Sequence, residues 1–212
     1  MTDILNRTVT TIVPPIVPPK QKTILLIDMD GVIARWYEAV LAELKERCPD
    51  EDIPALEDIT EYSVLKSFDP KLHSVLEDIM STEGLYLRLR PYQEALDAMK
   101  DMQHECSEWL EPFICTKPPH KYDLHLAHSE KVRWVTTYLG DWWAKKVILT
   151  NDKTLVHGDY LIDDIPYLTG ANQTPTWRHL LMDRPYNQHI EGTMRFTWDT
   201  WEVLKSLIYR NS

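Results

Sequence analysis

The sequence predicts an α/β protein with a doubly wound, mostly parallel sheet and a helical cap inserted after the first strand. Three observations lead to this fold class. Short, unbroken apolar runs recur along the chain, as they do in parallel strands that are covered on both faces. Amphipathic helical patterns separate most of these runs, which favours a parallel sheet. One stretch, residues 33–88, has a helical pattern and no convincing strand.

Five segments fit buried strands. They are KTILLIDMD (22–30), PFICT (112–116), KVILT (146–150), DYLIDD (159–164) and HLLMD (179–183). All of them end in acidic or hydroxyl-bearing residues. Open α/β sheets bind ligands beyond the carboxyl ends of their strands, so these terminal residues are the first candidates for a functional site.

Three helices are predicted outside the cap. Pro91 opens the first, which places Ala95 and Met99 on one apolar stripe. Ser129 caps the second, which ends at Gly140. The last covers about residues 199–208.

The segment 33–88 carries two amphipathic stripes. The first includes Ile33, Trp36 and Leu44, and DPKLHSVLEDIM (69–80) makes the second. Because this segment follows the first strand, we expect it to lie above the strand ends as a cap.

The chain therefore divides into three parts. Residues 1–22 form a Pro-rich arm, residues 33–88 the cap, and residues 23–32 and 89–212 the α/β core. The arm contains IVPPIVPPK, which should be an extended, polyproline-type segment. It serves either as a tail or linker, or as a docking ligand for a partner.

Composition and charge limit the function. The chain has 212 residues, 43% of them hydrophobic, which suits one domain with an insertion. Its net charge of −10 argues against a nucleic-acid polymer as partner but permits a small anionic ligand. Cys48, Cys106 and Cys115 suggest no disulfide framework. No signal, transit or transmembrane pattern is seen, so we expect a cytoplasmic protein without membrane attachment.

Pairs of acidic residues end two of the predicted strands. Asp28 and Asp30 end the first, and Gly31 allows the backbone to turn tightly there. Asp163 and Asp164 end another. Carboxylates gathered at one sheet edge would repel one another, and a hard cation such as Mg²⁺ resolves this. The competing interpretations are polar loop caps for the first pair and a solvated turn for the second.

Two more strand ends complete a phosphate site. Thr116 offers a hydroxyl, and Lys153 offers a positive charge. The order of acid pair, hydroxyl, lysine and acid pair resembles the four motifs of the haloacid dehalogenase (HAD) phosphatase superfamily. Within it, several blocks resemble the 5′(3′)-deoxyribonucleotidase family, from Thr23 to about His189: DMDGVIARW, PALED, FICT, EKVRWVTTYLG, VILTNDKT, LIDD, TGANQTPTWRHLL and NQH.

This resemblance implies roles for the acidic residues. Asp28 would be the nucleophile and form an aspartyl-phosphate. Asp30 would protonate the leaving oxygen and then take a proton from water. Mg²⁺ would be held by Asp28, the carbonyl of Asp30 and Asp164, with Asp163 acting in an outer position or through water.

The resemblance also implies a substrate pocket. Thr116, Lys117, Lys153 and Lys131 would contact the phosphate, and Trp36, Tyr62 and Val64 would form the base pocket. The alternatives are that Trp36 packs in the cap core and that Lys131 is a solvated surface lysine. The chain departs from the vertebrate enzymes at positions that put nucleobase choice and 5′ versus 3′ preference in doubt: Ser63, Lys117, His120 and Asn151.

We therefore expect a Mg²⁺-dependent phosphatase for deoxyribonucleoside 5′- or 3′-monophosphates, and family members are often homodimers. A phosphatase for sugar phosphates or phosphoglycolate is one alternative. A catalytically silent nucleotide-binding protein is another, but it would be expected to lack Asp28, Asp30, Lys153 or Asp164, and all four are present. A zinc site from the loop histidines His120, His125 and His128 is disfavoured, because they have no helical i,i+4 pair and no Cys partner.

Overall fold

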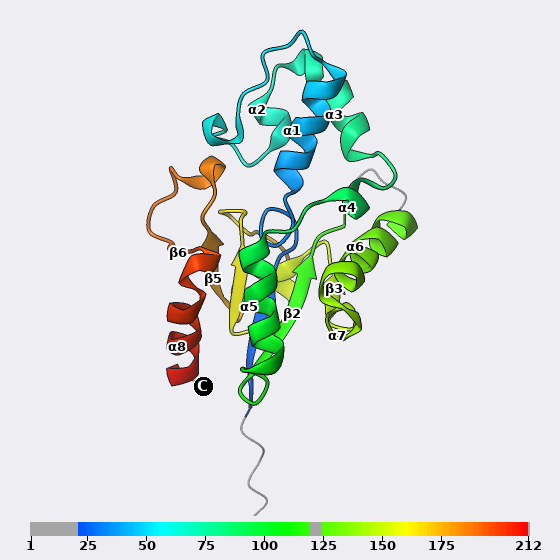
Figure 1. The fold of residues 1–212 in the computed structure, drawn as a ribbon. Helices are drawn as coiled ribbons and strands as arrows, with labels where there is room; N and C mark the ends of the chain where they lie inside the picture. The colour runs from blue at the N-terminus through cyan, green and yellow to red at the C-terminus, as the bar shows by residue number, and fades with distance from the viewer. Residues whose placement is uncertain (1–20, 119–123, 212) are drawn as a thin grey trace, which may run out of the picture.

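The computed structural model describes residues 21–118 and 124–211. Within these ranges, six parallel strands form one sheet in the order β3-β2-β1-β4-β5-β6 (Figure 1). The predicted parallel α/β class is confirmed. The strands are β1 (Thr23–Ile27), β2 (Leu110–Thr116), β3 (Val147–Leu149), β4 (Tyr160–Asp163), β5 (Arg178–Met182) and β6 (Met194–Phe196).

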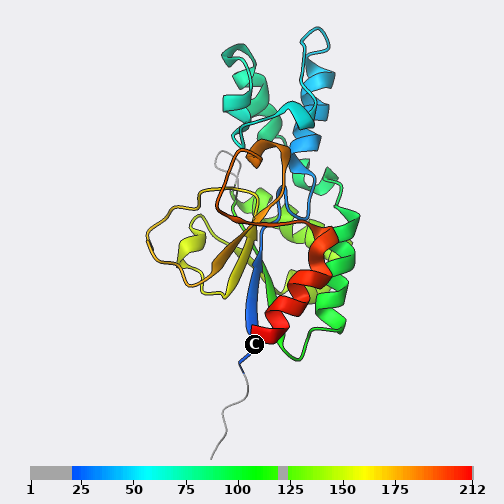
Figure 2. The same ribbon diagram turned by 90° about the vertical axis from the view of Figure 1, so that its left-hand side faces the viewer.

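The two faces of the sheet are covered differently. Leu25 and Ile27 of β1 share a buried apolar cluster with the three long core helices. Leu26, on the opposite face, packs in a smaller cluster with Trp177, from the loop before β5. Figure 2 shows the long helices on one side of the sheet and mainly loops on the other. The helices are α5 (Gln93–His104), α6 (Leu124–Leu139) and α8 (Trp201–Asn211), with the short α7 (Asp141–Ala144) beside them.

Some element boundaries differ from the prediction. Helix α6 begins at Leu124, so Ser129 lies inside the helix and is not its N-cap. A serine side chain can also bond to the backbone within a helix, which makes it an ambiguous start signal. Gly140 follows the helix with a φ of 85°, as predicted for a helix end. Strand β6 was not predicted, because its three residues are too few to show a pattern.

The cap lies above the carboxyl ends of the strands (Figure 1). Its helices bury an apolar core of their own, which includes Val40, Leu44, Leu76 and Ile79. Ile33 does not belong to it, because its side chain packs in the main core beneath. The cap elements are α1 (Trp36–Arg47), η1 (Leu56–Asp58), α2 (Val64–Ser67), η2 (Pro70–Leu72) and α3 (His73–Met80). The short α4 (Leu85–Arg88) follows the cap, and its Leu85 and Tyr86 are buried in the main core.

Helix α6 fixes the chain where it returns from the cap to the core. The buried carboxylate of Glu130 accepts a hydrogen bond of 2.6 Å from the backbone of Gly84. Four residues further along α6, the indole of Trp134 donates to the carbonyl of Leu89 at 2.8 Å.

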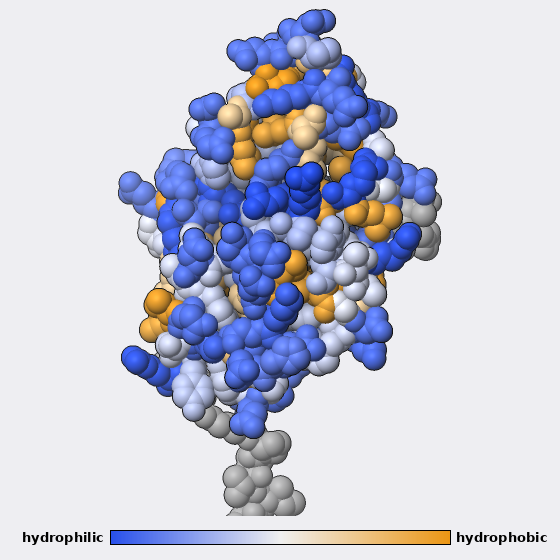
Figure 3. Space-filling view, in the orientation of Figure 1, coloured by the Kyte–Doolittle hydropathy of each residue, from blue (hydrophilic) through white to orange (hydrophobic). Residues whose placement is uncertain are grey.

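In the view of Figure 3, apolar surface shows between the cap helices, above a hydrophilic band where cap and core meet.

Several predicted features lie outside the described residues. They are the Pro-rich arm up to Lys20 and the loop that carries His120. The side chains of His125 and His128 are not described either. In the part of the chain that is described, no helix combines the length and apolar character that crossing a membrane requires.

Candidate active site

Neighbouring strand ends bring three of the predicted acids together. β1 and β4 are adjacent, and the backbone N–H of Asp28 donates to the carbonyl of Ile162 at 2.9 Å. Asp28, Asp163 and Asp164 each offer a carboxylate oxygen within 4.8 Å of the others. Asp28 is 5% exposed and Asp163 is fully buried. The solvated-turn interpretation of Asp163 is therefore wrong.

Lys153 lies between two of these carboxylates. Its Nζ is 2.7 Å from Oδ1 of Asp28 and 2.6 Å from Oδ2 of Asp163. Burial alone would lower the pKa of Lys153, but the charges of Asp163 and Asp28 outweigh it and raise that pKa. The second oxygen of Asp163 accepts from the N–H of Ile165 at 2.9 Å. Both oxygens of Asp163 are thus engaged within the protein.

Lys131 organises the other side of the site. Its Nζ lies 2.6 Å from Oδ2 of Asp30, 2.9 Å from Oγ1 of Thr116 and 2.9 Å from the carbonyl of Lys117. It also lies 4.8 Å from the centre of the Tyr86 ring. Lys131 is fully buried, so the interpretation as a solvated surface lysine is wrong.

Asp30 differs from Asp28 in its surroundings. Its side chain is 27% exposed, and its Oδ1 has no hydrogen-bond partner among the described residues. Burial of the carboxylate and the nearby charge of Asp28 raise the pKa of Asp30, against the opposing effect of Lys131. A raised pKa favours the protonated form that a general acid needs.

The turn after β1 requires glycine. Gly31 has a φ of 72°, and a Cβ there would lie 2.2 Å from Oδ2 of Asp164. The turn therefore passes directly against Asp164. This agrees with the sequence-based expectation that Gly31 allows a close backbone approach.

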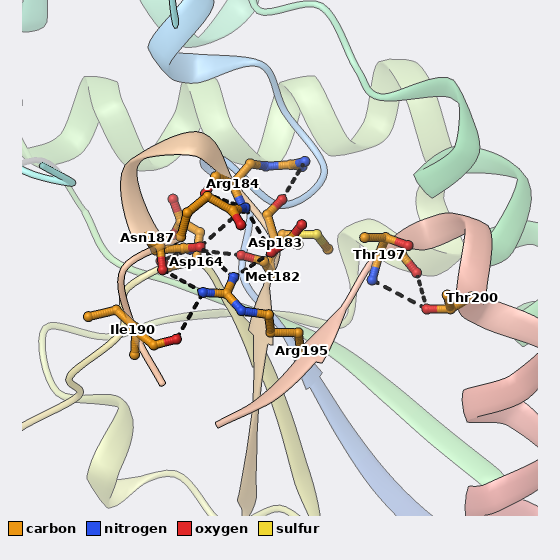
Figure 4. Close-up of polar contacts among 10 residues, drawn as sticks. Asp164, Met182, Asp183, Arg184, Asn187, Ile190, Arg195, Thr197 and Thr200 are labelled. Carbon is orange, nitrogen blue, oxygen red and sulfur yellow. Dashed lines mark hydrogen bonds and ion pairs between the residues drawn. The ribbon is translucent and has the colours of Figure 1, made fainter. Parts of the chain in front are cut away.

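Two residues that the sequence did not single out hold Asp164. The hydroxyl of Tyr186 donates to Oδ2 of Asp164. Nδ2 of Asn187 donates to the carbonyl of Asp164 at 3.0 Å (Figure 4). Burial and the charges of Asp163 and Asp28 raise the pKa of Asp164. Asn187 belongs to the NQH block of the family resemblance, but the block alone does not show what it contacts.

The charges in the site do not balance. The carboxylates of Asp28, Asp30, Asp163 and Asp164 face the ammonium groups of Lys131 and Lys153. Two negative charges are therefore uncompensated when all these groups are ionised. A divalent cation with a preference for oxygen ligands fits both the charge and the donor set. No other group of three possible ligands is found in the described residues.

Two cavities open at the acidic cluster and share Asp28, Tyr62 and Ile165. The larger, of about 370 Å³, is lined among others by Thr116, Lys117, Lys153 and Tyr167. The smaller, of about 140 Å³, is lined among others by Asp30, Trp36 and Tyr186.

Two of the three predicted base-pocket residues, Trp36 and Tyr62, line the smaller cavity, and the third, Val64, is buried in the cap. Tyr62 is 44% exposed and lines both cavities, and Trp36 lines the smaller one. Val64 instead is buried in the apolar core of the cap and is not among the residues that line the two cavities. It is the first residue of α2, and the apolar side of this short helix turns toward the cap core.

The sequence matches a known family over most of its length. Residues 22–211 match the family described as 5′ nucleotidase, deoxy (Pyrimidine), cytosolic type C protein. The human cytosolic-type 5′(3′)-deoxyribonucleotidase is 36% identical over 86% of this chain and 93% of its own length. The human mitochondrial 5′(3′)-deoxyribonucleotidase is 35% identical over 79% of this chain and 73% of its own length.

Solved structures with low sequence identity share the fold. A haloacid dehalogenase-like hydrolase from Streptococcus pneumoniae has a TM-score of 0.55 at 10% identity, covering 88% of this chain and 98% of its own. A HAD family hydrolase from Deinococcus radiodurans, with bound phosphate and sodium, also has a TM-score of 0.55, at 11% identity, covering 89% and 96%. The chain therefore belongs to the 5′(3′)-deoxyribonucleotidase family and is a phosphoric monoester hydrolase with the HAD fold.

Proposed function

We propose that this protein hydrolyses deoxyribonucleoside 5′- or 3′-monophosphates, with Mg²⁺, through an aspartyl-phosphate. The observation that carries the proposal is the pair of contrasting aspartates on one turn. Asp28 is buried against Lys153, whereas Asp30 is partly exposed, and its pKa is raised. This division of surroundings suits a nucleophile and a general acid.

Hydrolysis would proceed in two steps, phosphorylation of Asp28 and then release of phosphate by water. Asp28 attacks phosphorus, a bond forms between its carboxylate oxygen and phosphorus, and the ester P–O bond breaks. Asp30 gives its proton to the leaving ribose oxygen. Water then attacks phosphorus while Asp30 takes its proton, and the aspartyl-phosphate bond breaks to release inorganic phosphate.

The cation would be held by Asp28, Asp164 and the carbonyl of Asp30. Asp163 takes an outer position, because Lys153 and the Ile165 N–H engage both of its oxygens. When bound, Mg²⁺ would offset the negative charge of the carboxylates and the phosphate.

The phosphate would be held by groups that line the larger cavity. Thr116, Lys117 and Lys153 supply a hydroxyl and two positive charges there. Lys131 acts on the phosphate indirectly, through its contacts with Asp30, Thr116 and Lys117. Such preorganised donors stabilise the charge that develops in phosphoryl transfer.

A nucleobase fits the aromatic residues around these cavities better than a small sugar phosphate does. Trp36 and Tyr62 come from the cap, and Tyr167, 69% exposed, lines the larger cavity from the core. Aromatic rings that line a cavity are surfaces on which bases stack. The names of the relatives, which are deoxyribonucleotidases, agree with this substrate class.

A substrate panel tests the proposal. Nucleoside monophosphates with 5′ or 3′ phosphate, sugar phosphates and phosphoglycolate are assayed with Mg²⁺, and again after EDTA treatment. We expect turnover of deoxyribonucleotides that disappears with EDTA and returns with Mg²⁺. Preference for a sugar phosphate would support the first alternative, and binding without turnover would support a silent nucleotide-binding protein. Full activity in the chelated sample would contradict the metal assignment.

Compartment and assembly are part of the proposal. We propose that the protein is cytoplasmic, because a human relative with 36% sequence identity is named as the cytosolic type. The human relative named as mitochondrial has 35% sequence identity. The three cysteines are free thiols, which fits a reducing compartment. A homodimer and the absence of a nucleic-acid polymer or a membrane as partner remain predictions, and light scattering would test the first.

A further inference from the structure

The loop that joins β5 to β6, here called the β5–β6 loop, reaches the acidic cluster from a distant part of the sequence. Figure 4 shows the Arg195 guanidinium at its centre, donating to the carbonyls of Asn187 at 2.6 Å and Ile190 at 3.0 Å. Asn187, fully buried, donates from Nδ2 to the carbonyls of Asp164 and Met182 at 3.0 and 2.8 Å. The loop is thus tied both to β6 and to the end of β4.

One side chain of the β5–β6 loop contacts both the acidic cluster and the cap. Tyr186 is 2% exposed, and its hydroxyl donates to Oδ2 of Asp164. Its ring stacks on Tyr37 of α1, with centroids 5.2 Å and planes 22° apart. The Tyr37 hydroxyl donates to Oγ of Ser67 in α2 at 3.0 Å. A continuous line of contacts therefore joins Asp164 to the interior of the cap.

We propose that Tyr186 is a positioning residue that couples the acidic cluster to the cap, with separate tasks for its hydroxyl and its ring. The hydroxyl holds one oxygen of Asp164 and leaves the other for the cation. The ring holds α1 above the site, which keeps Trp36 and Tyr62 beside the substrate. The first task rests on the proposed metal site alone, and the second also rests on the proposed nucleotide substrate.

The surroundings explain why the hydroxyl matters. A carboxylate can rotate, and a hydrogen bond to one of its oxygens fixes the direction in which the other points. A Cβ on Gly31 would lie 2.7 Å from the Tyr186 hydroxyl and 2.2 Å from Oδ2 of Asp164. The turn that carries the catalytic aspartates thus closes against this hydrogen bond, with little room for water to replace it.

The hydroxyl is tested by Mg²⁺ binding without any nucleotide. Tyr186→Phe keeps the ring and removes the hydroxyl. We expect calorimetry to show Mg²⁺ affinity reduced by about 10- to 100-fold, the usual effect of losing a group that orients a metal ligand. Tyr92→Phe is the matched control, because the Tyr92 hydroxyl donates to Glu38 at 2.8 Å, a carboxylate outside the acidic cluster. Its Mg²⁺ affinity should remain that of the wild type.

The ring is tested by kinetics at saturating Mg²⁺. Tyr186→Phe should keep the KM for dUMP, while Tyr186→Leu should raise it by roughly two- to tenfold, the usual worth of an aromatic pair. If Tyr186→Leu does not fold, Tyr37→Leu removes the same stack from the cap side. Circular dichroism confirms that each variant is folded.

The outcomes separate this inference from the proposed function. Equal Mg²⁺ affinity for Tyr186→Phe and the wild type would show that the hydroxyl does not orient Asp164 for the cation. Equal KM values for Tyr186→Leu and Tyr186→Phe would show that the ring does not hold α1 above the site. A wild-type protein that binds Mg²⁺ but hydrolyses no nucleotide would overturn the proposed function, while weaker Mg²⁺ binding by Tyr186→Phe would still support the task of the hydroxyl.

Discussion

The two buried lysines of the site have different partners. Lys153 lies within 2.7 Å of two carboxylates, those of Asp28 and Asp163. Among the described residues, Lys131 contacts one carboxylate, that of Asp30, and its other polar partners are a neutral hydroxyl and a carbonyl. The same residue type thus holds two aspartates of one turn in unlike surroundings. Asp28 is 5% exposed and shares its lysine with Asp163, whereas the side chain of Asp30 is 27% exposed.

This difference teaches how neighbouring residues acquire separate chemical roles. A nucleophile must be charged and fixed in direction, whereas a general acid must be able to hold and release a proton. The surroundings, and not the side-chain type, supply these properties. Variants that change one lysine–aspartate pair at a time should therefore have unequal effects.

The largest effect is expected from Asp28→Asn. The amide cannot form the acyl phosphate, so turnover should disappear for every leaving group, and mass spectrometry should find no phosphorylated peptide containing position 28. Asp159→Asn is a control, since Asp159 precedes β4 at the other end of the sheet, where it accepts from the N–H of Ile24. Measurable turnover by Asp28→Asn would contradict the nucleophile assignment.

Asp30→Asn should have a large effect that depends on the leaving group. A nucleoside alkoxide needs a proton and a nitrophenolate does not, so turnover of dUMP should fall by about 10²- to 10⁴-fold. The first step with p-nitrophenyl phosphate should be less affected. Because the second step lacks its base, we expect a burst of nitrophenol and accumulation of phosphoenzyme in rapid-mixing experiments. Equal slowing for both leaving groups, without trapped phosphoenzyme, would show that Asp30 holds the turn or the metal instead.

Lys131→Met should have a smaller effect, seen mainly in the pH profile. Lys131 opposes the rise in the pKa of Asp30 that burial and Asp28 cause, so its removal raises that pKa further. The acid must be protonated, and kcat/KM falls as pH rises through its pKa. The alkaline limb should therefore move to higher pH. Lys100→Met, at an exposed pair with Asp97, is the control. A move to lower pH would contradict the assignment.

The sequence predicts the part of the site that depends on strand ends. An apolar run followed directly by acids places Asp28 and Asp163 at the carboxyl ends of adjacent strands. The partner of a helical lysine cannot be read in this way. Lys131 and Asp30 are 101 residues apart, and only the packing of α6 against the core shows that the lysine is buried.

Residues in irregular segments were the hardest to predict. Tyr186 lies in a loop with no periodic pattern, so nothing in its neighbourhood indicates the contact with Asp164. Val64 occupies a helix of four residues, too short for its apolar side to be inferred from spacing. The hydroxyl of Tyr186 and its partner Asp164 are 22 residues apart in the sequence.

The central position of β1 has a consequence for how the protein is made. β1 pairs with β2 on one side and with β4 on the other, so its partners are Leu110–Ile114 and Tyr160–Ile162. On the ribosome, its second edge stays without a partner until more than 160 residues have been synthesised. Unpaired apolar edges favour association with other chains, and distant pairings slow folding. We therefore expect nascent chains that end before β4 to be the forms most prone to aggregation and most in need of chaperones.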